Sequence, residues 1–309
     1  MKIAFVFSGQ GAQFPGMMKD LCASQPAAKV VFDAADGALG RGISDLCFEG
    51  AQEDLNLTHN TQPCVLAADL AAAMALKAHG IAPEGVAGFS LGEYAALAFA
   101  GSMPMKDAFE ITQYRADSMQ QAVAPGQGAM AAMMGGTPEQ VEAICAAVTE
   151  GYVAAANYNS PAQTVISGEA AAVDRAIALA REARIRGVKL AVSAPFHCAL
   201  MEPAARKLEA LFAKKAFEAP SVPVYMNVDA APNTDPARIP ELLVKQAMCP
   251  VRWMQTLLNM RADGFDTFVE CGPGKTLTGL AAKTLKDVTL LRVGDAGSFE
   301  ETLAALRQA

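Results

Sequence analysis

The stretch that surrounds Ser90 restricts the fold more than any other part of the sequence. A short apolar run, Val86–Phe89, leads into Gly88–Gly92, which reads G-x-S-x-G, and then into the helix-forming residues Glu93–Ala100. A sharp turn from strand to helix strains the backbone of the central serine, and the flanking glycines relieve the crowding. The pattern therefore predicts a sheet strand followed directly by a helix, with the serine hydroxyl projecting above the sheet.

Three further apolar runs are short and bounded by glycine, proline or polar turn residues, as expected of buried strands. These runs are Ile3–Phe7, Val222–Asn227 and Phe265–Glu270. Helical patterns separate the runs, at Pro63–His79, Met105–Val123 and Glu202–Phe217, with a closing helix at Phe299–Leu306. The alternation predicts an α/β fold with a parallel sheet. A chain of 309 residues, 52% of them hydrophobic, has enough apolar material for a sizeable core.

The rhythm of the sequence changes after Ala124–Gly128, which breaks the helical pattern. The expected elements are strand, helix, strand, strand, helix and strand, at Ala129–Met134, Pro138–Val148, Val153–Asn157, Thr164–Gly168, Ala170–Ala183 and Val188–Leu190. This order is the split βαβ arrangement of a ferredoxin-like unit. We therefore expect a large α/β-hydrolase-like domain, residues 1–124 and 192–309, interrupted by a small ferredoxin-like subdomain at residues 125–191.

Charge, cysteine content and hydropathy argue against several classes of protein. The net charge of −7 disfavours nucleic-acid binding, which usually requires a basic surplus. Seven scattered cysteines without a C-x-x-C pair predict neither a disulfide framework nor a metal site, and they fit a reducing cytosol. Met1–Phe7 is too short for a signal peptide. Cys64–Leu76 carries Asp69 and falls short of the roughly 18 residues of a membrane span. We expect a cytoplasmic protein that does not contact membranes.

Ser90 is the candidate nucleophile, although a glycine-rich turn with an incidental serine would show the same pattern. A serine hydroxyl needs a base to take its proton, and histidine is the usual base near neutral pH. His59 falls in an expected polar turn, and His79 ends an expected helix, where a cationic ring favours the helix dipole. His197 lies in a loop between an expected strand and helix, where catalytic groups are commonly presented. We predict His197 as the base.

The sequence shows no evident third member of a catalytic triad. Asp36-Gly37-Ala38 resembles the Asp-Gly-Ala of patatin-type Ser-Asp lipases, but in those enzymes the aspartate follows the serine, and here it precedes it. We interpret Asp36 as part of a helix end. A backbone carbonyl would then hold the base, which leaves a Ser-His dyad.

Arg115 lies on the helix face of Ala108, Ile111, Thr112 and Met119, at spacings of three, four and seven residues. The arginine is therefore expected to point inward. One interpretation is a snorkelling side chain that covers apolar surface. The other is a fork that binds a substrate carboxylate by paired charge-assisted hydrogen bonds. A plain lipase or thioesterase would not need such a fork.

These residues and several further motifs resemble the malonyl-CoA:acyl carrier protein transacylase family of bacterial type II fatty-acid synthesis. The resemblance spans the whole chain, and the motifs follow the family's order. They are Phe7–Gln13, Gly88–Tyr94, Gln113–Ala116, Asn157–Pro161, Val165–Gly168, Pro195–His197 with Ala199–Met201, and Glu270–Gly274.

The resemblance implies a function and the residues that carry it. Members of the family transfer a malonyl group from malonyl-CoA to the phosphopantetheine thiol of holo-acyl carrier protein, through an ester on serine and without a metal or other cofactor. In this chain Ser90 would be the nucleophile and His197 the base. Arg115 would hold the malonyl carboxylate, and the main-chain carbonyl of Gln246 would hold the histidine.

Further residues are implied around the acyl group. The backbone N–H groups of Gln10 and Leu91 would form the oxyanion hole, where fixed donors meet the developing negative charge. Phe196 matches the bulky residue associated with malonyl rather than branched acyl units in related acyltransferase domains. The family usually has histidine directly before the nucleophile, in G-H-S-L-G, whereas this chain has Phe89. We expect Phe89 to shape the pocket and the transferase activity to survive the change.

Carrier proteins are typically acidic, so an acidic enzyme needs a local basic rim to bind one. The candidates, each of which could instead be an ordinary solvated charge, are Arg184, Arg186, Lys189, Lys275 and Lys283. The chain is expected to act as a monomer. Two other interpretations use the same serine and histidine: an acyltransferase that supplies a polyketide synthase, and a serine thioesterase or lipase with water as acceptor. A catalytically silent scaffold that binds carrier protein is a third.

Overall fold

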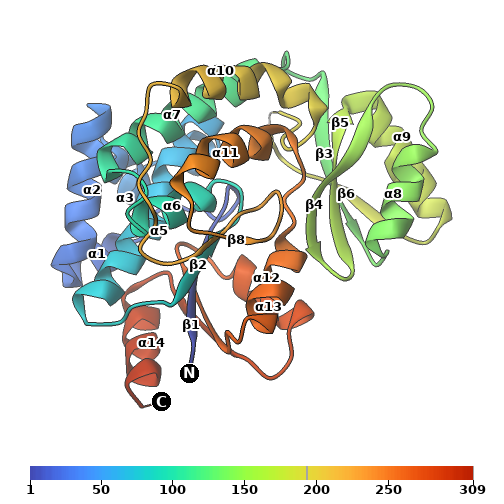
Figure 1. Ribbon diagram of the computed structural model, residues 1–309. Helices are drawn as coiled ribbons and strands as arrows, with labels where there is room; N and C mark the ends of the chain where they lie inside the picture. Colours follow the sequence, from blue (N-terminus) through green and yellow to red (C-terminus); the bar gives the residue numbers. More distant parts are fainter. Residues whose placement is uncertain (193, 309) are drawn as a thin grey trace.

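Two β-sheets organise the chain (Figure 1). The computed structural model describes residues 1–192 and 194–308. In this part of the chain, one sheet has six strands in the order β10-β9-β1-β2-β7-β8, and the other has four strands in the order β4-β5-β3-β6. The six-stranded sheet consists of β1 (Ile3–Phe7), β2 (Gly85–Gly88), β7 (Val224–Tyr225), β8 (Pro232–Asn233), β9 (Thr267–Cys271) and β10 (Thr289–Val293).

The large sheet is parallel except for β8, which runs antiparallel to β7. Its register aligns the ends of the central strands, because Phe7 pairs with both Gly88 and Cys271. The carboxyl ends of β1, β2 and β9 are therefore level with one another. The loops that follow these strands meet at one edge of the sheet, which is where ligands bind in open α/β sheets.

Helices cover both faces of the large sheet, which explains why its strands are apolar on both sides. Phe5 and Phe7 enter the larger core, whereas Ala4 and Val6 face the smaller core formed with α12 and α13. The helices outside the small sheet are α1 (Lys19–Ser24), α2 (Pro26–Leu39), α3 (Ile43–Glu49), α4 (Gln52–Leu55), α5 (Thr58–Ala78), α6 (Gly92–Phe99), α7 (Met105–Gln121), η1 (Ala199–Met201), α10 (Glu202–Phe212), η2 (Pro236–Arg238), α11 (Ile239–Met248), α12 (Trp253–Ala262), α13 (Thr276–Thr284) and α14 (Ala296–Gln308). None of the helices described has the length and apolar character needed to cross a membrane.

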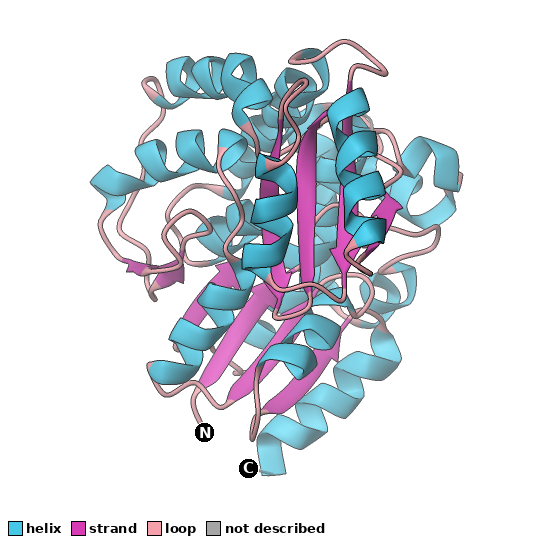
Figure 2. Cartoon of the chain, turned by 90° about the vertical axis from the view of Figure 1, so that its right-hand side faces the viewer, coloured by secondary structure: helices cyan, strands magenta, loops and turns pink. Residues whose placement is uncertain are grey.

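The small sheet is antiparallel throughout. Its elements follow the order β3 (Gly128–Met134), α8 (Pro138–Ala146), β4 (Val153–Ser160), β5 (Gln163–Glu169), α9 (Ala170–Glu182) and β6 (Arg186–Lys189), as predicted for a ferredoxin-like unit. Figure 2, viewed from this side of the molecule, shows helices lying over the outer face of the sheet. The opposite face carries Met130, Ala132 and Val165, which pack with Met119 and Phe196.

Strands of the large sheet lie within residues 1–124 and 192–309, and strands of the small sheet lie within residues 125–191. We propose that the chain is divided into two domains at these positions. Residues 193 and 309, which belong to the second segment of the large domain, are outside the part of the chain that the structure describes.

The predicted start of one helix is wrong, because α5 begins at Thr58 instead of Pro63. Proline lacks an N–H, so Pro63 leaves the His59 carbonyl without its partner in the helix. That carbonyl instead accepts hydrogen bonds from Arg41 Nη2 at 2.9 Å and Gln113 Nε2 at 3.1 Å. His59 therefore lies in the first turn of a helix and not in a polar turn.

Other boundaries also differ from prediction. The expected helix Glu202–Phe217 ends at Phe212, and the chain turns so that Phe217 packs against Phe212 with ring centroids 5.6 Å apart. The expected strand Val222–Asn227 is only two residues long, Val224–Tyr225.

Asp69 is a fully buried carboxyl group in α5. Burial raises its pKa well above the usual value, and hydrogen bonding to Ser8 offsets only part of this rise. Gly272 makes this placement possible, since a Cβ at that position would lie 1.9 Å from Asp69 Oδ1. The side chain therefore stays protonated far above the pH at which an exposed aspartate ionises.

Replacing this carboxyl group should change how stability depends on pH. An acid whose pKa is raised by folding binds its proton more tightly in the folded chain, so the free energy of unfolding falls as pH rises above about 4. We expect the melting temperature of the Asp69→Asn variant to fall less than that of the parent between about pH 5 and pH 8. Thermal unfolding at both pH values tests this, with the exposed Asp45→Asn as control; equal slopes would contradict it.

Candidate active site

Ser90 lies in a tight turn between β2 and α6, as the G-x-S-x-G pattern predicts. Its φ of 54° is in the left-handed region, which non-glycine residues rarely adopt. The turn is so close that a Cβ on Gly88 would lie 1.9 Å from the carbonyl carbon of Gly92. Glycine is therefore required at position 88, and the turn directs the serine side chain into a cavity.

His197 is paired with this serine. Its Nε2 lies 2.6 Å from Ser90 Oγ, and its Nδ1 lies 2.8 Å from the main-chain oxygen of Gln246 in α11. A carbonyl oxygen can only accept, so Nδ1 carries the proton and Nε2 has a lone pair directed at the hydroxyl. His197 is only 4% exposed. The arrangement leaves a neutral base ready to accept the serine proton.

The surroundings of His197 keep its ring uncharged. Burial is the main cause and the positive charge of Arg115 the second, and together they lower the pKa of His197 to about 3. The hydrogen bond to Gln246 acts in the opposite direction, because it stabilises the ring that donates. His197 is thus in its basic form throughout the neutral range.

Arg115 is the third member of this cluster and is only 1% exposed. Its Nη2 donates to Ser90 Oγ at 3.1 Å and to Gln246 Oε1 at 3.0 Å, while Nη1 donates to Gln62 Oε1 at 2.7 Å. The guanidinium also lies 5.2 Å from the centre of the Tyr94 ring. All the bonded oxygens are uncharged, and Nε has no partner among the described residues. The buried carboxyl group of Glu93 acts on Arg115 electrostatically, but burial raises the pKa of Glu93 to about 8, so this group is largely uncharged near neutral pH. Burying a cation without an ionised partner is costly, so the site is suited to an anion.

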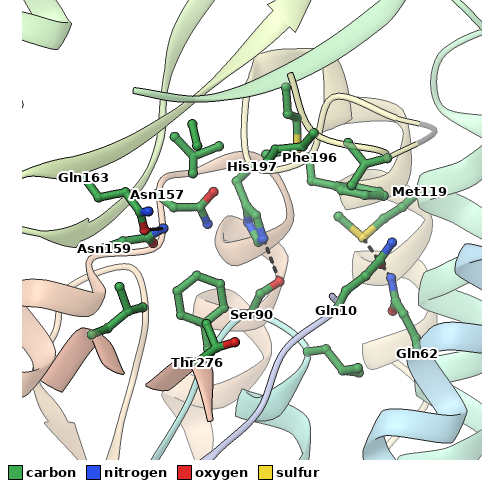
Figure 3. A pocket seen from close by; sticks show the side chains of 18 of the residues that line it. Gln10, Gln62, Ser90, Met119, Asn157, Asn159, Gln163, Phe196, His197 and Thr276 are labelled. Carbon is green, nitrogen blue, oxygen red and sulfur yellow. Dashed lines mark hydrogen bonds between the residues drawn. The ribbon is translucent and has the colours of Figure 1, made fainter. Parts of the chain in front are cut away.

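A cavity of about 230 Å³ contains these groups. Figure 3 shows Ser90 facing His197, with Asn157, Asn159 and Gln163 on one side and Gln10, Gln62 and Met119 on the other. The lining residues come from both sheets and from the helices between them: Gln10, Gln62, Phe89, Ser90, Leu91, Arg115, Met119, Met130, Ala132, Asn157, Asn159, Gln163, Val165, Leu190, Val192, Phe196, His197, Thr276 and Leu280.

The structure brings together the residues singled out in the sequence. Gln10, Leu91 and Phe196 line the cavity, and Gln246 reaches it through hydrogen bonds to the serine, the histidine and the arginine. The other candidates lie elsewhere. His79 is exposed and contacts Gln25, and Asp36 accepts a hydrogen bond from the backbone of Ser44 at the end of α2.

Several site residues do not follow from the sequence pattern. Gln62 is one of several polar residues at the start of α5, and Asn227 follows a strand. Neither signal indicates which distant group the side chain contacts. For Asn157 and Asn159, the sequence predicts only that they belong to a motif. Within residues 1–192 and 194–308, no cluster of three or more His, Cys, Asp or Glu side chains could hold a metal ion.

Comparisons with known proteins agree on a family. The acyl transferase domain family matches residues 4–303. The malonyl CoA-acyl carrier protein transacylase of Bacillus subtilis (strain 168) is 43% identical over 99% of this chain and 98% of the relative. The enzyme of that name from Escherichia coli (strain K12) is 41% identical over 98% of this chain and 99% of the relative.

The chain belongs to this transacylase family. Solved structures of the family confirm the predicted fold class. The acyl-carrier-protein S-malonyltransferase of Burkholderia pseudomallei 1710b superimposes with a TM-score of 0.96 at 42% identity, covering 98% of this chain and all of that one. A malonyl-transacylase in complex with a type II PKS acyl-carrier protein gives a TM-score of 0.96 at 38% identity, covering 99% of this chain and all of that one.

One position of this transacylase departs from the G-H-S-L-G motif that the resemblance leads us to expect. Phe89 stands where G-H-S-L-G has histidine, and its ring meets Trp253 edge-on, with centroids 5.5 Å apart and an interplanar angle of 73°. The ring contributes an apolar surface to the cavity that Ser90 faces. It adds no group that could titrate, so it leaves the Ser90–His197 pair as the local acid-base system.

The pH dependence of Ser90 acylation tests the state of His197. Because the basic form of the histidine persists down to a pH near its pKa of about 3, we expect the rate of Ser90 acylation by a neutral sulfonyl fluoride to stay flat between about pH 5 and pH 7. Mass spectrometry of the modified protein gives the rate. A tenfold fall with an inflection near the ordinary histidine pKa of about 6.5 would show that the ring is protonated in this range.

Proposed function

We propose that this transacylase transfers a malonyl group from malonyl-CoA to the phosphopantetheine thiol of holo-acyl carrier protein. The observation that carries the proposal is Arg115, a buried cation that lacks a bonded carboxylate and donates to Ser90 Oγ at 3.1 Å. A planar guanidinium binds a carboxylate through two parallel hydrogen bonds. An acyl group with a free carboxylate would supply the missing charge at the correct distance from the nucleophile.

The proposed reaction has two half-reactions. Ser90 Oγ attacks the thioester carbonyl while His197 Nε2 takes the hydroxyl proton, and coenzyme A leaves with that proton as its thiol. The phosphopantetheine thiol of the carrier protein then attacks the malonyl ester, and the proton passes through His197 back to Ser90. The backbone N–H groups of Gln10 and Leu91 would stabilise the oxyanion in both steps.

The same arrangement explains a preference for malonyl over acetyl groups. An acetyl group would displace water from the cavity without supplying a negative charge. The buried Arg115 cation would then have no anion paired with it. Phe196, at the cavity wall, would limit bulk on the acyl chain. We also propose that the protein acts as a monomer in the cytoplasm.

Formation of a malonyl ester on Ser90 is the direct test. In Arg115→Ala we expect kcat/KM for ester formation to fall at least about 30-fold, because losing one partner of a buried charge pair costs about 2 kcal/mol or more. Intact-protein mass spectrometry after brief mixing with malonyl-CoA measures the ester, and Ser90→Ala should form none.

The matched control is Arg41→Ala, because Arg41 is also held by amide side chains but lies outside the cavity. It should leave ester formation unchanged. Discharge of the ester by holo-acyl carrier protein, much faster than by water, distinguishes a transferase from a thioesterase. A discharge only by polyketide-type carrier proteins would favour a polyketide pathway. An ester that never forms would contradict the proposal.

A basic rim around the cavity mouth is proposed to bind the acidic carrier protein. Exposed Arg184, Arg186 and Lys189 lie on or next to β6, which leads to the lining residues Leu190 and Val192. The exposed residues Lys275 and Lys283 lie next to and within α13, whose residues Thr276 and Leu280 line the opposite wall. On this proposal, both groups of cations flank the entrance.

Charge reversal at this rim should weaken only the second half-reaction. For Arg186→Glu and Lys283→Glu we expect the KM for carrier protein to rise about threefold or more at low salt, since rim charges act mainly on association. Malonyl-ester formation from malonyl-CoA should not change. Steady-state kinetics at varied carrier-protein concentration measures the effect, with Lys29→Glu on α2 as control. A variant with an unchanged KM would remove that residue from the rim.

A further inference from the structure

We propose that Asn227 is a positioning residue that holds Ser90 in its reactive conformation. Asn227 lies two residues beyond β7 and is fully buried. It is not among the residues that line the cavity. It can therefore act on the reaction only through the residues that it contacts.

The side-chain amide of Asn227 bridges the turn that contains the nucleophile. Its Oδ1 accepts a hydrogen bond from the Ser90 N–H at 2.8 Å, and its Nδ2 donates to the Gly88 carbonyl at 2.7 Å. The backbone pairing of β2 with β7 ends at Ala87 and Tyr225. The side-chain amide thus continues the sheet ladder past the last paired residues, with the same donor and acceptor groups that a peptide unit would offer.

Ser90 needs this support because its backbone is in the left-handed region. Relaxation to an ordinary φ would turn its hydroxyl away from His197. Two side chains prevent this change of φ, one by binding the backbone N–H of Ser90 and the other by binding its carbonyl. Asn227 binds the Ser90 N–H, and Gln246 Nε2 donates to the Ser90 carbonyl at 2.7 Å.

Asn227 is itself fixed by its own backbone. Its N–H donates to Glu93 Oε2 at 2.6 Å, and its carbonyl accepts from the Arg252 N–H at 3.0 Å. Glu93 lies in the first turn of α6, three residues after the nucleophile, and is fully buried. The start of α6 and the loop after β7 are therefore tied together around the serine.

The test separates positioning from folding and from malonyl binding. The probe is phenylmethylsulfonyl fluoride, which sulfonylates an activated serine and has no carboxylate for Arg115 to bind. We expect Asn227→Ala to lower the second-order rate constant of sulfonylation about tenfold or more, and kcat of malonyl transfer by a similar factor. KM for malonyl-CoA should change less than about twofold, because Arg115 and the cavity wall are untouched. Mass spectrometry and steady-state kinetics supply the two readouts.

The matched control is Asn233→Ala, which removes another buried asparagine, whose side chain binds the Asp235 carbonyl at 3.0 Å. It should leave both rate constants unchanged for the folded protein. Asn227→Asp is the second variant, in case the alanine variant does not fold. It keeps an acceptor for Ser90 and loses the donor to Gly88, and should still lower the sulfonylation rate about threefold or more.

Wild-type sulfonylation by a folded Asn227→Ala, or by Asn227→Asp where the alanine variant does not fold, would overturn the inference. A rise in KM for malonyl-CoA with kcat unchanged would also overturn it. The inference rests on the proposed role of Ser90 as nucleophile but not on the malonyl substrate. If malonyl-CoA failed to acylate the enzyme, the sulfonylation rates would still decide the role of Asn227.

Discussion

Gln246 forms hydrogen bonds with Ser90, His197 and Arg115, and so fixes their positions relative to one another. Its carbonyl fixes the His197 ring, its Nε2 holds the Ser90 carbonyl, and its Oε1 accepts from Arg115. A carboxylate in place of that carbonyl would orient the histidine equally well, but it would add a negative charge to the cluster that contains Arg115. The use of an uncharged oxygen therefore keeps the cation available to an anionic substrate, which explains why the site contains a dyad and not a Ser-His-Asp triad.

The two sheets have different roles around the cavity. The large sheet aligns the ends of β1, β2 and β9, so that the loops carrying Gln10 and Ser90 meet at one edge. The small sheet uses one face for its own core with α8 and α9, and its other face, through Met130, Ala132 and Val165, closes the cavity. An apolar wall beside a buried cation lowers the local dielectric, which strengthens every charge interaction in the cavity.

Local sequence predicted the features that depend on local physics. Glycine spacing around Ser90 indicated the strained turn, and helical periodicity indicated that Arg115 points inward, because both are set by neighbours within a few residues. The start of α5 could not be predicted in this way. Pro63 would normally end a helix, and only the distant donors Arg41 and Gln113 satisfy the carbonyl that it leaves unpaired. Asn227 was missed for the same reason, since its partners lie about 140 residues earlier in the chain, at separations of 137 and 139.

The contact between Asp69 and Gly272 also restricts how the sequence can evolve. A side chain at position 272 would collide with the Asp69 carboxyl group, and Gly272 has a φ of 133° that already disfavours other residues. Position 272 could accept alanine only after position 69 had become smaller and Ser8 Oγ, which would lie 2.4 Å from the new Cβ, had moved, so the order of the substitutions matters. Asp69 therefore makes a glycine in a loop next to the active site harder to replace, although the two residues belong to segments about 200 positions apart in the sequence.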